Sequence, residues 1–335
     1  MRIQDNYIPS LIFIGHFAID NIITSSIQSK TALGGSVSYC SYGLRTYTNN
    51  VKISIISHVG TLNMKKSMLK IIKNKNINLD GIKYTSIKNT NFLLDYSNRE
   101  RILTLKSRSP NLEFEDLPIE VIKSPPDLFA LVPLCNEISL QYVSRVAASF
   151  PNAYIGIDLQ GFVRKIDENG KVSIVYDDNI VKNINKIIDE IGDKLILKGS
   201  EEDIMALANN QTDLSATMRN FKDFGMDGIF IMTRGEHGSL IYKKECEILQ
   251  IPAFKPKKVV DETGAGDVYF SIFLYEFLRS DKSWMSIKSS AYKASAAASY
   301  LIEKEGLSGS ETRKNVLNRV TKREYIKGRG GFEYI

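Results

Sequence analysis

Short apolar stretches alternate along this chain with longer segments of helical periodicity. The apolar stretches are rich in β-branched residues and are bounded by Gly, Pro or Asp, as buried strands are. We interpret as strands the stretches 11–15, 52–60, 127–134, 154–161, 194–199 and 228–235. The helical patterns lie between them, at 36–47, 64–76, 139–150, 183–192 and 200–210. Because strands joined through helices run parallel, the alternation predicts an α/β fold, a doubly wound and mostly parallel sheet flanked by helices.

Two regions break this alternation. Residues 17–33 and 82–108 are extended and polar with alternating apolar positions, which indicates a small β-sheet attached to the main one. Such a sheet can cover a ligand site as a lid, although a purely structural edge would show the same pattern. We expect residues 1–335 to form a single domain that carries this lid. The lid edge could also pair two subunits in a homodimer.

The charges of the chain are scattered. Lys and Arg number 44 against 38 Asp and Glu, a net charge of +6, and no run of five or six like charges appears. We therefore expect no nucleic-acid or membrane partner. The three cysteines, Cys40, Cys135 and Cys246, are too far apart to indicate a disulfide framework or a zinc pair. The apolar runs near the N-terminus are too short to span a bilayer, so we expect a cytoplasmic protein.

The stretch KKVVDETGAGD, residues 257–267, leads from an expected strand into the segment 268–278. That segment is apolar on all sides and is typical of a buried helix. The first turn of a helix has backbone N–H groups without helical partners, so a glycine-rich turn there can bind an anion. The amides that we expect to do so belong to Gly264, Ala265 and Gly266.

Asp267 follows these small residues in the same turn. Its carboxylate would repel a bound phosphate unless it had a chemical role, such as taking a proton from an attacking hydroxyl. The combination indicates phosphoryl transfer, although an aspartate that only caps the helix would look the same. The P-loop pattern GxxxxGK[ST] does not occur, and no GxGxxG follows the first strand. These two absences disfavour a P-loop kinase and a nicotinamide-dependent oxidoreductase.

Over nearly its whole length the chain resembles the ribokinase-like (PfkB) family of carbohydrate and nucleoside kinases. The segment 261–267 is similar to the family signature D-T-x-G-A-G-D, with Glu262 in place of the commoner threonine. Three further elements follow the family order: a strand that ends in Gly15 and is followed by an aspartate, the Leu-Gly-Gly segment 33–35, and the segment 231–242.

The resemblance implies an ATP-dependent kinase that acts on an alcohol beneath a β lid. It implies that Asp267 is the general base and that the amides of Gly264, Ala265 and Gly266 hold the transferred phosphoryl group. The residues implied to grip the acceptor hydroxyls are Asp20, Gly34 and Gly35. The residues implied to lie along the nucleotide are Thr233, Gly235 and Gly238.

The chain departs from the family at the N-x-x-E motif, which is tied to magnesium and phosphate and falls within 197–204. Ser200 replaces the asparagine and can still orient water beside the nucleotide. Asp203 then replaces the glutamate, whereas a shift of one residue would make Glu202 the acid. Both carboxylates therefore stay candidates for the water shell of Mg²⁺.

Two further stretches bear on the acceptor. Residues 158–164, DLQGFVR, place Gln160 and Arg164 just past a strand, and residues 132–139 do the same with Glu137. Turn and capping roles are the alternative for these side chains. The D-x-Q-G-x-x-R and P-x-x-x-E-I patterns resemble the archaeal and plant myo-inositol kinase branch.

We therefore expect transfer of the γ-phosphate of ATP to a hydroxyl of a small polyol or sugar, inositol included. We rank this acceptor class above a nucleoside by a small margin. A nucleoside kinase of the same family is one alternative. The other is a catalytically lapsed protein that senses a sugar or nucleotide, to which the altered motif around Ser200 gives some weight.

Overall fold

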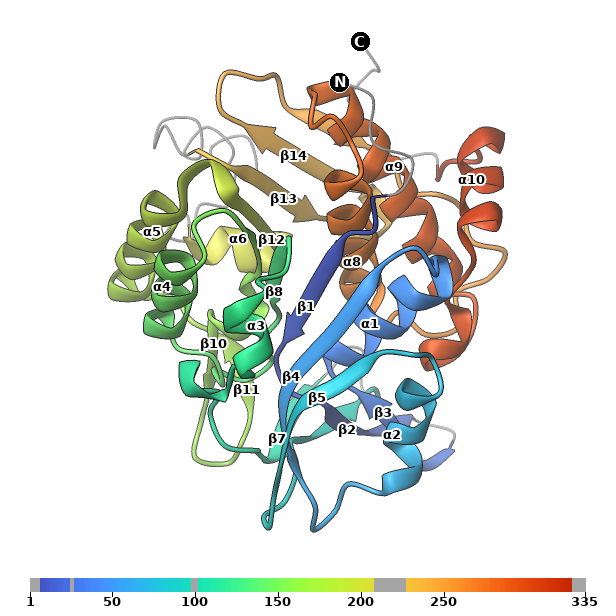
Figure 1. Cartoon of the computed structure of the whole chain (residues 1–335). Coiled ribbons are helices and arrows are strands. Elements are labelled where there is room, and N and C mark those ends of the chain that lie inside the picture. The colour runs from blue at the N-terminus through green and yellow to red at the C-terminus, as the bar shows by residue number, and fades with distance from the viewer. Residues whose placement is uncertain (1–6, 25–26, 98–101, 208–226, 327–335) are drawn as a thin grey trace.

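The computed structural model describes residues 7–24, 27–97, 102–207 and 227–326 (Figure 1). Its largest element is a nine-stranded sheet, built from β1 (Ser10–Ile14), β4 (Lys52–Gly60), β5 (Asn78–Thr85), β8 (Leu128–Leu131), β9 (Tyr154–Asp158), β12 (Leu195–Ser200), β13 (Ile229–Thr233), β14 (Ser239–Lys243) and β15 (Leu249–Ile251). The spatial order is β15-β14-β13-β12-β9-β8-β1-β4-β5. Only the β13–β14 and β14–β15 pairs of this sheet are antiparallel, which confirms the predicted sheet.

Helices cover both faces of this sheet (Figure 1). One face packs against α1 (Ser36–Tyr47), α2 (Lys66–Lys73), α8 (Ala265–Leu278), α9 (Trp284–Leu301) and α10 (Arg313–Lys322). The other packs against α3 (Ile119–Lys123), α4 (Leu140–Ser149), α5 (Asp178–Ile191) and α6 (Glu201–Leu207). No helix in the described part of the chain is long and apolar enough to cross a membrane.

The apolar runs of the strands follow from this layering. Along β1, Leu11 and Phe13 pack into the core on the α1 and α8 side, and Ile12 and Ile14 pack into the core on the other side. Successive side chains of a strand point to opposite faces, so a strand between two helix layers must be apolar at every position. The same reasoning explains α8, which packs between α1 and α9 and is buried from residue 268 to 278.

A second, smaller sheet has four strands in the order β3-β2-β6-β7. We call this sheet the lid, after the role expected of it from the sequence. Its strands are β2 (Ala18–Thr24), β3 (Ile27–Gly34), β6 (Asn91–Asp95) and β7 (Ile102–Ser107). The expected lid segment 82–108 began too early, because residues 82–85 belong to β5 and pair with β4 in the main sheet. A separate hairpin, β10 (Arg164–Ile166) with β11 (Val172–Ile174), lies beside the lid.

The topology predicts where a ligand binds. β1 lies between β4 on one side and β8 on the other, so the order of the parallel strands reverses around it. Ligands of doubly wound sheets bind past the carboxyl ends of the strands at such a reversal. The lid strands follow the carboxyl end of β1 directly. Residues 257–260 were expected in a strand, but they are not in one, since β15 ends at Ile251.

Candidate active site

A single large cavity lies where the topology predicts it. Its volume is about 1980 Å³, larger than the roughly 300–1,000 Å³ of a site for one small ligand. The lid, the carboxyl ends of β12 and β13 and the first turn of α8 all line it. The predicted site residues that line it are Asp20, Gly35, Gln160, Arg164, Ser200, Glu202, Asp203, Thr233, Gly235, Gly238, Gly264, Ala265, Gly266 and Asp267. The cavity therefore has room for two substrates, and it gathers residues from across the chain.

The glycine-rich turn starts α8 at Ala265, with Gly264 as its N-cap. Gly264 has a φ of 78°, and a Cβ there would lie 2.1 Å from the Tyr39 ring, so glycine is required. The Ala265 amide donates to the Glu262 carbonyl at 3.2 Å, so it is used within the turn. Among the described residues no carbonyl accepts the amide of Gly264 or of Gly266, so these two of the expected three amides are available to an anion.

The first aspartate of the motif fixes this turn. The carboxylate of Asp261 accepts the Thr263 amide at 3.0 Å and the Gly306 amide at 2.9 Å. It thereby ties the turn before α8 to the loop that follows α9. Its role is to position the anion-binding turn.

Asp267 lies in the first turn of α8 and faces the cavity. Burial raises the pKa of its carboxyl group to about 6, and nearby Asp158 adds to the rise. The Lys198 ammonium, a hydrogen bond from Ser36 and the charge of Arg164 oppose that rise. A carboxylate with a pKa near neutrality can accept a proton from an alcohol during a reaction.

Lys198 is a residue of this site that the sequence reasoning missed. It lies on β12 with 4% of its surface exposed, and its Nζ is 2.8 Å from a carboxylate oxygen of Asp158. A Cβ on Gly266 would lie 3.0 Å from the same Nζ, so the ammonium lies against the anion-binding turn. Burial alone would lower its pKa, but Asp158 and Asp267 hold that pKa above its usual value. A lysine inside an apolar strand was the available signal, because unpaired lysines are almost never buried.

The acceptor candidates lie on the lid side. Asp20, on β2, is 7% exposed, and its carboxylate rests on Gly34, where a Cβ would lie 1.8 Å from the oxygen Oδ2. Gly34 does not line the cavity itself, so it makes room for Asp20, whereas Gly35 caps α1 and does line it. Gln160 follows β9 and also lines the cavity, as does Arg164, which donates to the Leu134 carbonyl at 2.8 Å.

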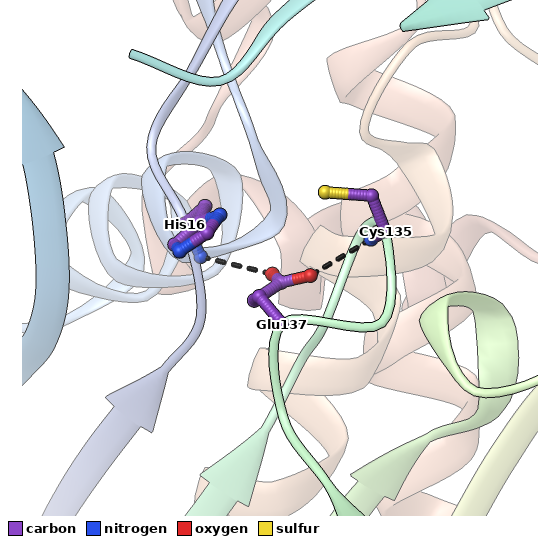
Figure 2. Close-up of side chains that lie close together, drawn as sticks. All are labelled: His16, Cys135 and Glu137. Atoms are coloured by element: carbon purple, nitrogen blue, oxygen red, sulfur yellow. Dashed lines mark hydrogen bonds between the residues drawn. The ribbon is translucent and has the colours of Figure 1, made fainter. Parts of the chain in front are cut away.

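Glu137, predicted to bind the acceptor, does not line the cavity. It is fully buried, and its carboxylate accepts the backbone amides of His16, Leu134 and Cys135 at 2.8–3.1 Å. Figure 2 shows the bonds to His16 and Cys135. Because both oxygens already accept hydrogen bonds, the acid positions the loops that follow β1 and β8 and does not contact the acceptor.

His16, Cys135 and Glu137 place ligand atoms within 4.8 Å of one another, close enough for a metal ion (Figure 2). The ring nitrogens of His16 are already used, however, with Nδ1 at 2.9 Å from the Thr90 hydroxyl and Nε2 at 2.9 Å from the Pro110 carbonyl. A metal would have to displace these bonds and those of Glu137, so the cluster is a hydrogen-bonded part of the core.

The expected nucleotide residues follow β13. Thr233 ends the strand, and the hairpin turn behind it contains Gly235 and Gly238, with φ of 52° and 78°. A Cβ on Gly238 would lie 2.0 Å from the Ile251 carbonyl oxygen, so this glycine lets the turn pack against the end of β15. Beyond it the cavity continues along apolar surface, contributed by Phe254, Ala298, Ile302 and Tyr325.

The altered metal motif forms the start of α6. The Ser200 amide and hydroxyl donate to the Asp203 carboxylate at 2.8 and 2.7 Å, and the Asp203 amide lies 3.2 Å from the Ser200 hydroxyl. This reciprocal pair is a capping box. Both residues line the cavity together with Glu202. The two carboxylates fit a hydrated Mg²⁺, which proteins hold through one or two acids and the substrate phosphates.

The doubly wound sheet, the small β lid and the cavity between them define a ribokinase-like α/β protein. A solved pyrophosphate-dependent kinase in the ribokinase family, complexed with a pyrophosphate analog and myo-inositol, has this fold with a TM-score of 0.71. It is 19% identical in sequence, and the match covers 92% of this chain and 99% of that one. Residues 48–314 match the model of the pfkB family of carbohydrate kinases. The chain belongs to that family, whose members transfer phosphate to an alcohol group.

Two curated relatives are nucleoside kinases by name. A nucleoside kinase of Methanothermobacter thermautotrophicus is 33% identical over 111 residues, which span 33% of this chain and 32% of the relative. A cytidine kinase of Thermococcus kodakarensis is 21% identical over 271 residues, 80% of this chain and 88% of the relative. The stronger identity is therefore confined to about a third of the nucleoside kinase, and the full-length likeness is weak.

Proposed function

We propose that this protein transfers the γ-phosphoryl group of ATP to a hydroxyl of a small acceptor with neighbouring hydroxyls, a sugar, a polyol or a nucleoside. The observation that carries the proposal is the convergence of Asp267, Gly266 and Lys198 in one cavity. A proton acceptor, a backbone amide and an ammonium group thus line the same cavity, and the ammonium lies next to Gly266. Phosphoryl transfer needs these groups, because its catalysis is mostly positioning and charge stabilisation.

Each group has a defined task. Asp20 accepts hydrogen bonds from the hydroxyls of the acceptor. Asp267 takes the proton of the attacking hydroxyl while the oxygen of that hydroxyl forms a bond to the γ-phosphorus. The bond from that phosphorus to the bridging oxygen of ADP breaks, and ADP leaves. The Gly266 amide and Lys198 stabilise the negative charge on the transferred group. Mg²⁺, which Glu202 and Asp203 would hold through its water shell, supplies further positive charge to the donor phosphates.

ATP is the proposed donor because the cavity extends well past the anion-binding turn. Thr233 and Gly238 line the continuation, and beyond them lie the apolar surfaces of Ala298 and Ile302 on and just after α9. Pyrophosphate would leave this apolar part empty, whereas a purine base would bury it. A direct exchange of ATP for pyrophosphate in the assay tests this choice of donor.

The test of the function is ADP release with Mg-ATP across a panel of sugars, inositols and nucleosides. Asp267→Asn removes the proton acceptor with little change in shape. Asp193→Asn, at the opposite end of β12 and outside the cavity, is the matched control. We expect turnover with at least one acceptor, lost in Asp267→Asn and kept in Asp193→Asn. Turnover that survives in Asp267→Asn would contradict the assigned role.

A sensor without catalysis is the second candidate, and the capping box at Ser200 and Asp203 favours it, because it already uses one of the two carboxylates proposed to hold Mg²⁺. Its signature is a rise in melting temperature with ATP or an acceptor, without any ADP release. The same panel, read by thermal shift, separates the two candidates.

A further inference from the structure

Part of the acceptor side of the cavity is lined by apolar side chains. Among the residues that line the cavity, the lid and β11 contribute five of them: Phe92, Leu94, Leu103, Val172 and Ile174. The first three come from β6 and β7, and the last two from β11. Phe92, Leu94, Leu103 and Val172 share one apolar cluster. We call these five residues the apolar wall.

The hairpin that completes the apolar wall is fixed to the lid. The Leu105 amide on β7 donates to the Gly170 carbonyl at 2.7 Å, and Thr104 forms a bridge with Lys171. Gly170 has a φ of 80° and approaches so closely that a Cβ would lie 2.2 Å from the Leu105 carbonyl oxygen. These contacts fix the hairpin to the lid sheet, so the apolar residues of both elements keep their positions relative to one another.

The hairpin also brings Arg164 and Ser173 to the cavity, but the other polar groups of the acceptor side come from other elements. Asp20 projects from β2, Gln160 follows β9, and Asp267 begins α8. The acceptor therefore meets hydrogen-bonding groups at the phosphate-transfer end and an apolar surface elsewhere. A ring that carries hydroxyls all the way round does not match such a site, because a hydroxyl buried without a partner costs about 1–3 kcal/mol.

We propose, on the basis of the kinase function above, that the acceptor is a ribonucleoside, with its sugar hydroxyls at Asp20 and Asp267 and its base against the apolar wall. The flat, weakly polar faces of a nucleobase suit aliphatic and aromatic side chains. Tyr96 and Tyr176 also line the cavity and are 37% and 52% exposed, which leaves aromatic surface available to a base. This order of acceptors reverses the one expected from the sequence.

The test compares matched acceptors and one matched pair of variants. Uridine, cytidine, inosine and adenosine are compared with ribose and myo-inositol by kcat/KM for ADP release and by thermal shift without donor. Val172→Thr keeps the volume of the wall residue but adds a hydroxyl. Val121→Thr makes the same change on α3, where the half-buried side chain lies outside the cavity.

We expect a nucleoside to exceed ribose and myo-inositol in kcat/KM by about tenfold or more, the range that apolar contacts supply in enzyme specificity. Val172→Thr should remove several-fold of that preference without changing the KM for ATP, and Val121→Thr should leave it intact. A free sugar or inositol that reacts as well as every nucleoside overturns the proposal, although the kinase function stands.

The thermal shift keeps the two proposals distinguishable. If no acceptor supports turnover that depends on Asp267, the kinase function fails. Stabilisation by a nucleoside that is weakened in Val172→Thr would still support the assigned role of the apolar wall. If no nucleoside stabilises the protein or reacts, the nucleoside inference is wrong.

Discussion

The ammonium group of Lys198 lies 2.8 Å from the carboxylate of Asp158, and both side chains are buried. A buried ion pair contributes little net stability, because the loss of hydration offsets the attraction. Its value here is positional, since Asp158 holds the ammonium beside Gly266. Asp267 adds a second carboxylate to the pair. The trio therefore has one unmatched negative charge, which the proton taken during transfer would neutralise.

The first prediction concerns Lys198→Met. Loss of the ammonium should lower kcat about 10²- to 10³-fold, the usual cost of removing a group that stabilises a developing charge. Lys198→Met alone also leaves the buried Asp158 carboxylate without its counter-charge, which destabilises the fold. The double variant Lys198→Met/Asp158→Asn relieves this strain and should fold, yet remain equally inactive. Lys70→Met on α2, an exposed position, is the control. Activity in the folded double variant would remove Lys198 from the mechanism.

The second prediction is a pH profile. Because Asp267 acts as a base only when ionised and its pKa is about 6, kcat/KM should rise with pH through about 6 and then level off. Ser36→Ala removes a hydrogen bond that lowers this pKa, so its profile should move to higher pH. A profile measured on both proteins that is flat between pH 5 and 8 would show that another group accepts the proton.

The third prediction links the same carboxyl group to stability. Its pKa is raised from 3.8 to about 6 on folding, so the folded protein binds more protons than the unfolded chain between these values. The folded state is therefore not destabilised by this group below about pH 4, where the carboxyl group is protonated in both states. Its destabilising effect grows as the pH rises through 6. Asp267→Asn cannot titrate and avoids this effect. We expect Asp267→Asn to be more stable by about 3 kcal/mol at pH 8, since each unit of the pKa difference is worth about 1.4 kcal/mol.

Urea unfolding at several pH values measures this effect. The advantage of Asp267→Asn over the parent protein should shrink as the pH falls and should vanish near pH 4. An inactive variant that is more stable than the active protein is expected where a site keeps a charge buried for its chemistry. If the stability difference between Asp267→Asn and the parent protein were the same at pH 8 and pH 4, burial of the ionised carboxyl group would have no energetic cost.

Much of the fold could be predicted because its elements have a simple periodicity. α1 occupies residues 36–47, the range expected from the sequence. Strands between two helix layers are apolar throughout, which makes them easy to recognise. Residues 82–85, the second half of β5, were placed in the expected lid segment, because an exposed edge strand mixes polar and apolar residues as the lid strands do. β5 pairs with β4, and this pairing depends on tertiary structure, which the local sequence pattern does not reveal.

The sequence identified residues that line the cavity where a residue type and a turn belong to the same short segment. Asp267 and Gly266 are of this kind, and both line the cavity. Lys198 was missed because its partner Asp158 is 40 residues away in sequence. The same reason applies to Glu137, which was expected at the acceptor. Its carboxylate accepts a hydrogen bond from the backbone amide of His16, 121 residues away in sequence. Contacts between distant segments decide whether a buried polar side chain binds a ligand or another part of the chain.

The last prediction tests that structural role of Glu137. Glu137→Gln keeps the shape but replaces one carboxylate oxygen by a donor, which would face backbone amides that are also donors. A buried hydrogen bond to a charged group contributes about 1.5–3 kcal/mol, so we expect the free energy of unfolding to fall by roughly this amount. Glu120→Gln, on the surface of α3, is the matched control and should have no effect.

The acceptor KM decides between the two roles of Glu137. If Glu137 only joins the loops after β1 and β8, Glu137→Gln lowers the melting temperature. The acceptor KM, measured below that temperature, then stays within about twofold of the parent value, a change of under about 0.5 kcal/mol in binding free energy. If it binds the acceptor, as the sequence led us to expect, KM rises at least tenfold and stability changes little. Because four hydrogen bonds from backbone amides already reach its two oxygens, the first result is the one that the geometry predicts.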